Sequence, residues 1–172
     1  MQADLSDIYF RASRFLSTIK KKLHEVGLDP YFPFIDHICY RVATVERYFF
    51  ICDQLIASGN KLLRESIING RSIAVFEMSS PFRFDGLAVD ILEVPAPKSV
   101  SYYPEGFEHA EVVLQEDFHS FMQAHDDLSF DTSGVNKSHN PELRLTFDEL
   151  SVKFHHQALA RIVALENEQE SK

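Results

Sequence analysis

Two apolar, β-prone runs along the chain open in the same way, each with a carboxylate followed by a histidine. The runs span residues 34–42 and 107–114. Each is followed by an amphipathic helical stretch and then by three more strand-like runs, so the pattern of apolar and polar positions predicts a duplicated βαβββ module. The acid and histidine pairs that open the two modules are Asp36-His37 and Glu108-His109.

The first half of the chain is predicted to hold two helices and four strands. Apolar residues recur every three or four positions between Leu5 and Leu23, which predicts an amphipathic helix that ends near Gly27. Asn69-Gly70 lies between two β-prone runs and predicts a hairpin with a tight turn. The remaining predicted elements are a strand at 34–42, a helix at 45–57 and strands at 60–68, 71–78 and 87–94.

The second half repeats this order, and the chain is predicted to form one α+β domain over residues 1–172. We expect both terminal helices to pack outside the paired modules, and the polar residues from Glu166 onward to fray. The predicted elements are a strand at 107–114, a helix at 117–126, strands at 128–136, 142–147 and 150–155, and a C-terminal helix. The parts of the domain are an N-terminal helical extension (1–30), a first module (31–95), a linker (96–106), a second module (107–156) and a C-terminal helix and tail (157–172).

Composition and charge narrow the class of protein. The chain is 45% hydrophobic and 25% charged, which is typical of a globular domain. Its formal net charge of −9 and its scattered basic residues argue against nucleic acids and anionic membranes as partners. The N-terminal residues lack the pattern of a secretory signal and no run is long enough to cross a bilayer, so we expect a cytoplasmic protein. Cys39 and Cys52 are then expected to be reduced core residues.

Side chains alternate between the two faces of a strand, which determines the neighbours of each histidine on the two opening strands. His37 shares a strand face with Cys39 and Arg41, and His109 shares one with Glu111. If the modules pack as equivalent halves, both histidines point into one shared cleft. The same alternation places the acid before each histidine on the opposite face, so we expect these acids to be exterior carboxylates rather than partners of the imidazoles.

Several short motifs from residue 34 onward together carry a family resemblance. They are Asp36-His37-Ile-Cys-Tyr-Arg41, Ile68-Asn69-Gly70-Arg71, Glu93-Val-Pro95-Ala-Pro97, Glu105-Gly106-Phe-Glu108-His109-Ala-Glu111, Asn140-Pro141 and Lys153-Phe154-His155. This set resembles the YecM family of bacterial proteins within the vicinal oxygen chelate superfamily, which includes glyoxalase I, extradiol dioxygenases and bleomycin-resistance proteins. The resemblance implies a paired βαβββ fold of the glyoxalase/bleomycin-resistance/dioxygenase type and a metal site, without implying a particular reaction.

In the superfamily pattern, metal ligands come from the first and last strands of each module. The resemblance therefore implies His37, Glu93 and His109 as ligands, with His155 as the fourth. A carboxylate is usual at the fourth position, and a register slip of one residue would present His156 in place of His155. Two neutral imidazoles and one carboxylate leave open positions on a divalent metal such as zinc, nickel, iron or manganese.

Charged residues near these ligands suit either a small anionic molecule or an internal ion pair. Glu111 is a candidate catalytic base, a further ligand or a paired carboxylate. Arg41, Arg71 and Lys153 would hold an anionic ligand if they face the cleft, because guanidinium and ammonium groups bind carboxylate and phosphate. The alternatives are strand-end charges and internal ion pairing with Glu93 or Glu111.

Two classes of function follow from these residues. A metal-dependent enzyme would use the ion as a Lewis acid on a small oxygen-rich acid, with isomerase, lyase or dioxygenase chemistry. A non-catalytic protein would bind or sequester a small anion in the same cleft. The chain has no glycine-rich phosphate loop, nucleophile elbow or dinucleotide fingerprint, so nucleotide-cofactor chemistry is not expected.

Overall fold

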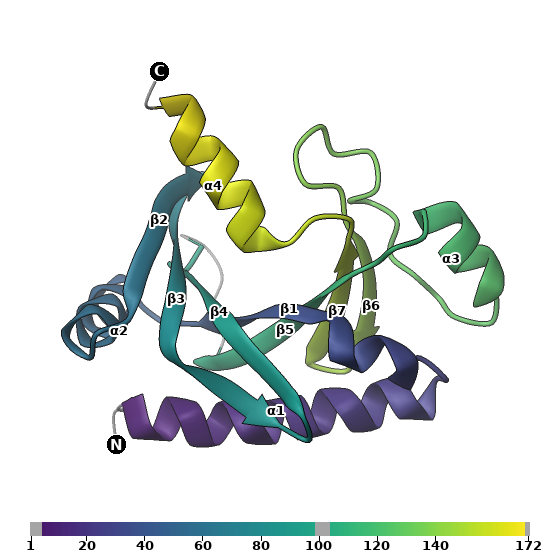
Figure 1. Cartoon of the computed structure of the whole chain (residues 1–172), viewed down its shortest axis with the longest axis horizontal. Coiled ribbons are helices and arrows are strands. Elements are labelled where there is room, and N and C mark those ends of the chain that lie inside the picture. The colour runs from purple at the N-terminus through teal and green to yellow at the C-terminus, as the bar shows by residue number, and fades with distance from the viewer. Residues whose placement is uncertain (1–4, 99–103, 171–172) are drawn as a thin grey trace.

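The computed structural model describes residues 5–98 and 104–170, and it shows a curved sheet flanked by helices (Figure 1). The helices are α1 (Leu5–Glu25), α2 (Val45–Ala57), α3 (Phe118–Ala124) and α4 (Leu159–Glu170), with a 3-10 helix, η1, at Asp29–Phe34. The strands are β1 (Ile35–Arg41), β2 (Lys61–Ile68), β3 (Arg71–Phe84), β4 (Leu87–Pro95), β5 (Gly106–Val113), β6 (Leu143–Phe147) and β7 (Leu150–His155). Residues 99–103 of the predicted linker lie outside the described residues.

Within the described residues, the strands form one seven-stranded sheet in the order β2-β3-β4-β1-β5-β7-β6. β1 pairs in parallel with β4, and β5 pairs in parallel with β7, so the first and last strands of each predicted module are neighbours. The two modules join where β1 and β5 run antiparallel in the middle of the sheet. The predicted α+β fold class is confirmed, and the strands that carry His37 and His109 lie side by side.

The main hydrophobic core lies between the sheet and the helices α1, α2 and α3. Leu16 of α1 is buried in one cluster with Ile38 of β1 and Val112 of β5. At the far end of the sheet, the ring centroid of Phe121 in α3 lies 4.8 Å from that of Phe154 in β7. Because side chains alternate along a strand, this packing directs the other residues of β1 and β5, including both histidines, to the opposite face.

Helix α4 lies on that opposite face, across the sheet from α1 (Figure 1). Its Val163 is buried in a small cluster with Val75 of β3 and Ile91 of β4. The expectation that both terminal helices pack outside the modules is therefore wrong for α4. The apolar side chains that β3 and β4 present on this face are covered by the apolar side of α4, which brings the helix over the cleft.

The polar end of α4 is held by Arg64 of β2. Arg64 Nε lies 3.0 Å from Glu166 Oε2, and its Nη1 donates a hydrogen bond of 2.7 Å to Asn167 Oδ1. Glu170 contacts the same guanidinium. The helix therefore continues past Glu166, where the sequence predicts fraying, because these side chains find a cation on the neighbouring strand.

Two local predictions have different outcomes. Asn69 and Gly70 have φ angles of 52° and 78°, and two positive φ angles are what a type I′ hairpin turn requires. The strand predicted at 128–136 is wrong, because the described segment contributes only one isolated bridge, between Asp131 and Arg144. Asp131 accepts a hydrogen bond from the backbone N–H of Ser133 at 2.9 Å, a local contact that favours a turn over a strand.

None of the helices in the described part of the chain has the length and apolar character that crossing a bilayer requires.

Candidate metal centre

The two acid and histidine pairs occupy equivalent irregularities in the ladder between β1 and β5. The register shifts once at Asp36 on β1 and once at Glu108 on β5, so each acid is an extra residue between paired positions. A bulge of this kind breaks the alternation of side chains and re-aims the extra residue. The acid is thereby placed beside the histidine that follows it, His37 on β1 and His109 on β5.

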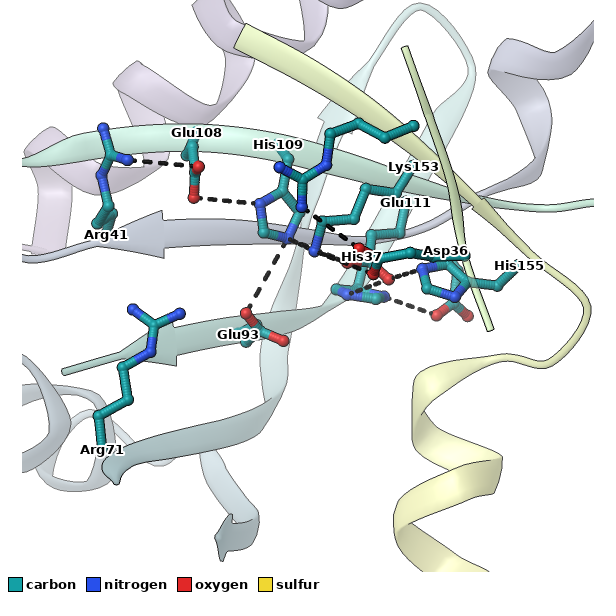
Figure 2. A network of polar contacts seen from close by, with 12 residues as sticks. Asp36, His37, Arg41, Arg71, Glu93, Glu108, His109, Glu111, Lys153 and His155 are labelled. Atoms are coloured by element: carbon teal, nitrogen blue, oxygen red, sulfur yellow. Dashed lines mark hydrogen bonds and ion pairs between the residues drawn. The ribbon is translucent and has the colours of Figure 1, made fainter. Parts of the chain in front are cut away.

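Each acid contacts the Nδ1 atom of its own histidine (Figure 2). Asp36 Oδ2 lies 2.9 Å from His37 Nδ1, and Glu108 Oε2 lies 3.3 Å from His109 Nδ1. The prediction that both acids face away from the imidazoles is therefore wrong, because it assumed unbroken alternation. A carboxylate on Nδ1 fixes the orientation of the ring and leaves Nε2 to face the cleft.

The carboxylate of Glu111 lies at the centre of the site, between the two histidines (Figure 2). Its Oε1 is 3.0 Å from His109 Nε2, and its Oε2 is 3.3 Å from His37 Nε2. Two residues of β7 complete the group, since Lys153 Nζ donates a hydrogen bond of 2.8 Å to Oε1 and His155 Nε2 contacts Oε2. One carboxylate therefore joins side chains from β1, β5 and β7, so both modules contribute to the site.

These groups are almost fully removed from water. Four residues of the cluster are each only 2% to 4% exposed: His37, His109, Glu111 and His155. Burial alone raises the pKa of Glu111, but the positive groups around it, led by His37 and Lys153, hold that pKa well below its ordinary value. Burial lowers the pKa of His37, and the carboxylates of Glu111 and Asp36 outweigh this effect and raise it to about 10. The negative charge of Glu111 and the positive charges around it therefore stabilise one another.

The nitrogen and oxygen atoms of the cluster are spaced as ligands of one metal ion would be. One ligand atom from each of His37, His109 and Glu111 lies within 4.8 Å of the others. Bonds of about 2.1 Å to one ion separate neighbouring ligand atoms by about 3.0 to 3.4 Å, and the contacts of Glu111 Oε1 with His109 Nε2 and of Glu111 Oε2 with His37 Nε2 have separations of this size. His37 Nε2 is also buried, and its 3.3 Å contact with Glu111 Oε2 is an ion pair without the geometry of a hydrogen bond, so the atom has no hydrogen-bond partner among the described residues. This donor set fits a divalent transition metal.

The residues predicted as ligands lie at different depths in this cluster. Glu93 Oε1 is 4.0 Å from His109 Nε2, so Glu93 lies at the edge of the group. Glu111, the predicted catalytic base, takes the central place. His155 is buried against Glu111 whereas His156 is exposed, so the register of β7 directs His155 into the site.

The three predicted anion-binding cations have different partners. Arg41 Nη1 lies 3.3 Å from Glu108 Oε1, and Lys153 is bonded to Glu111, so internal ion pairing describes both of these residues. Arg71 lines the adjoining pocket, and its Nη1 donates a hydrogen bond of 3.1 Å to a backbone carbonyl. Of the three, it is the one without an ion pair to a described carboxylate, which leaves its guanidinium available to an anionic ligand.

A pocket of about 1030 Å³ opens beside the cluster. Its lining includes His109 and Glu111 of the cluster, Arg71 of β3 and Ile162 of α4. The volume is that of a small-molecule site, and its lining mixes apolar and charged groups. The buried cluster therefore has a space beside it in which a small molecule can contact it.

Several contributors to this site are not predicted from the sequence. Strict alternation puts Asp36 and Glu108 on the wrong face, although the repetition of an acid next to a histidine in both modules is a usable signal. Glu142 Oε2 lies 3.7 Å from Lys153 Nζ. Nothing in the sequence marks Glu142 or α4 as part of the site. Glu142 is the first residue of the predicted strand at 142–147, where a charged residue is unremarkable, and helical periodicity does not say which face of a sheet a helix covers.

Solved structures with a similar arrangement have a glyoxalase-like fold. A methylmalonyl-CoA epimerase from Streptomyces coelicolor is 13% identical and gives a TM-score of 0.53, over 73% of this chain and 95% of that one. A methylmalonyl-CoA epimerase solved with methylmalonyl-CoA is also 13% identical and gives 0.54, over 74% and 96% of the two chains. At such identities the likeness shows the fold, and the protein is one of this fold class.

The family is narrower than the fold class. The model of the YecM protein family matches residues 4–166, and this chain belongs to that family. Protein YecM of Escherichia coli (strain K12) is 30% identical over 95% of this chain and 94% of its own length. The structural-genomics protein EC4020 is 30% identical with a TM-score of 0.74, over 94% of this chain and 92% of that one. An uncharacterized protein of Haemophilus influenzae is 32% identical over 66% of this chain and 59% of its own length.

Proposed function

We propose that this protein binds one divalent transition metal through His37, His109 and Glu111, beside a pocket that takes a small anionic molecule. The observation that supports the proposal most is the meeting of these three buried side chains, with His37 Nε2 left without a hydrogen bond. His155 and Glu93 are close enough to supply further ligands. Two imidazoles and a carboxylate are a ligand set found in zinc hydrolases and non-haem iron proteins.

The residues around the three ligands suit this role. Asp36 and Glu108 contact the Nδ1 atoms and so direct both Nε2 atoms inward. Imidazole must be unprotonated at the coordinating nitrogen, so we expect metal binding to release protons and to strengthen as the pH rises.

The molecule proposed for the pocket is a small oxygen-rich acid. A bound divalent metal supplies Lewis-acid chemistry toward two neighbouring oxygens of such a molecule. Arg71 holds the carboxylate or phosphate end, since its guanidinium forms no ion pair among the described residues. Glu111 is engaged by the histidines, and Glu93, which lines the pocket, is the carboxylate left to exchange a proton with the bound molecule. Isomerase, lyase or dioxygenase chemistry is consistent with these roles.

Non-catalytic capture of a small anion is the second candidate function. It is favoured by Lys153, whose Nζ lies 2.8 Å from Glu111 Oε1 and 3.2 Å from His109 Nε2, because a carboxylate paired in this way is less available as a catalytic base. The two functions differ in one observable result. An enzyme converts the molecule that it binds, whereas a sequestering protein returns it unchanged.

Elemental analysis of protein purified without chelator tests the proposed metal. We expect about one equivalent of zinc, nickel, iron or manganese per chain. A folded protein that carries none of these ions, and takes up none when they are titrated in, would contradict the proposal. Binding of dicarboxylates, 2-oxoacids and phosphorylated acids is then screened by thermal shift in metal-loaded and metal-free protein, and each molecule that binds is followed by NMR for conversion.

A further inference from the structure

Lys153 places a positive charge at the centre of the proposed metal site (Figure 2). It faces Glu111 directly in the parallel ladder between β5 and β7. Its Nζ lies 2.8 Å from Glu111 Oε1 and 3.2 Å from His109 Nε2. These two residues are among the three that we propose as metal ligands, so the ammonium occupies atoms that the metal needs.

An ammonium and a divalent metal compete for these atoms. His109 Nε2 has a single lone pair, so it cannot bond to a metal at about 2.1 Å while it accepts a hydrogen bond from the ammonium. Two cations on the same atoms also repel each other strongly where little water screens them. The ammonium therefore has to leave before a metal can be bound.

A second carboxylate lies within reach of the same lysine. Glu142 Oε2 is 3.7 Å from Lys153 Nζ, and both side chains line the pocket. The carboxylate of Glu142 already pairs with one ammonium group, since Glu142 Oε1 lies 3.0 Å from Lys137 Nζ. A rotation of the flexible lysine stem toward Glu142 keeps the positive charge paired after it leaves Glu111.

We propose that Lys153 is an internal competitor for the metal, which neutralises Glu111 in the metal-free protein and moves to Glu142 when a metal binds. This inference rests on the proposed metal-binding function. Lys153 then determines how tightly the site holds an ion, because every binding event has to displace the ammonium. It also contributes, with His37, to the stability of the metal-free site, because a buried carboxylate needs neighbouring positive charge.

Zinc titration of the metal-free protein by calorimetry tests the competition. Lys153→Met removes the charge and keeps an apolar stem of similar length, and we expect at least about tenfold tighter zinc binding. Lys137→Met is the matched control, because it removes the same charge from the same pocket at a residue that contacts Glu142; its effect is expected to be far smaller. Glu142→Gln removes the destination of the ammonium, so it should weaken zinc binding in the wild-type background and not in the Lys153→Met background.

The outcomes separate this inference from the function on which it rests. Equal zinc affinities for the wild type and Lys153→Met would overturn the competition and leave the metal function standing. Failure of both proteins to bind any of zinc, nickel, iron and manganese would overturn the metal function itself. If circular dichroism shows that Lys153→Met does not fold, a structure of the zinc-loaded wild type decides. Lys153 Nζ on Glu142 would support the proposal, and Lys153 Nζ still bonded to Glu111 beside zinc would overturn it.

Discussion

Asp36 Oδ2 accepts a hydrogen bond of 2.8 Å from the backbone N–H of Leu159, the first residue of α4. The same oxygen lies 2.9 Å from His37 Nδ1. The first N–H groups of a helix have no acceptor within the helix, so this contact stabilises the start of α4. One carboxylate atom therefore connects the helix over the pocket with a histidine of the site.

Replacing Asp36 with alanine is expected to weaken both connections. Loss of the acceptor for Leu159 costs about 1 kcal/mol in the free energy of unfolding. Loss of the partner of His37 Nδ1 lowers metal affinity by about 10- to 100-fold. Urea denaturation and calorimetric metal titration measure the two effects. Asp36→Asn keeps an acceptor oxygen and should recover more of the stability than of the affinity, and a wild-type metal affinity in Asp36→Ala would contradict the proposed role.

Replacing either His37 or His109 with alanine is expected to abolish metal binding. Each removes one imidazole from a set in which two imidazoles and one carboxylate hold the ion. Metal content is measured by elemental analysis and the fold by circular dichroism. His119→Ala is the matched control, because His119 is an exposed residue of α3, and it should bind metal as the wild type does. Retention of a full metal equivalent by His37→Ala would refute the ligand set.

The anion specificity of the pocket is expected to depend on Arg71. Arg71→Ala should remove the increase in melting temperature that dicarboxylates or phosphorylated acids cause, since binding to the folded state raises its stability. Arg83→Ala is the control, because Arg83 is an exposed arginine on the same strand, β3. Equal anion-dependent shifts in Arg71→Ala and the wild type would show that the guanidinium does not contact the ligand.

Loss of Arg64 is expected to loosen the C-terminal half of α4. Arg64 contacts Glu166 and Asn167, so Arg64→Ala should increase amide hydrogen exchange along α4 while exchange in β4 stays slow. Lys61→Ala is the control, because Lys61 lies on the same strand, β2, and pairs with Glu77. Unchanged exchange in α4 would mean that its contacts with β3 and β4 suffice to hold the helix.

Glu105 is expected to contribute stability that is lost in acid. Its carboxylate accepts hydrogen bonds from Arg47 Nη2 at 2.7 Å and from the Tyr40 hydroxyl at 3.0 Å. Burial raises the pKa of Glu105, but these donors outweigh burial and lower it below the ordinary value of 4.5. The contribution is therefore complete above that ordinary value and disappears as the pH falls through the lowered one.

Glu105→Gln tests this dependence by urea denaturation at neutral and acidic pH. The free energy of unfolding should fall by about 1 to 3 kcal/mol at neutral pH, with a smaller loss in acid. Glu149→Gln, in the exposed turn between β6 and β7, should leave the acid dependence as it is. An unchanged pH profile in Glu105→Gln would contradict the role of Glu105.

Local patterns in the sequence predicted much of the fold and part of the site. Apolar periodicity located most helices and strands, and Asn69-Gly70 located a hairpin, because these signals depend on residues close together in the chain. The bulges at Asp36 and Glu108 could not be predicted in this way. A bulge is a relation between two strands, and it is visible only when β1 is aligned with β5.

The position of α4 and the role of Glu142 depend on tertiary structure. An amphipathic pattern states which side of a helix is apolar, but the connection from β7 and the contact with Asp36 determine the face on which α4 lies. Glu142 reaches Lys153 only because β6 pairs with β7. Both features join segments whose proximity the sequence does not display.

The ladder between β1 and β5 pairs His37 with Glu111 and Cys39 with His109. A half-turn that exchanges the two strands therefore exchanges the histidines with each other and Cys39 with Glu111. If the gene arose by duplication and fusion, the ancestral dimer of single modules carried both histidines and two copies of the acid in one symmetric centre. In this chain one half carries the acid, Glu111, where the other carries the thiol of Cys39, so the two halves now contribute differently to that centre.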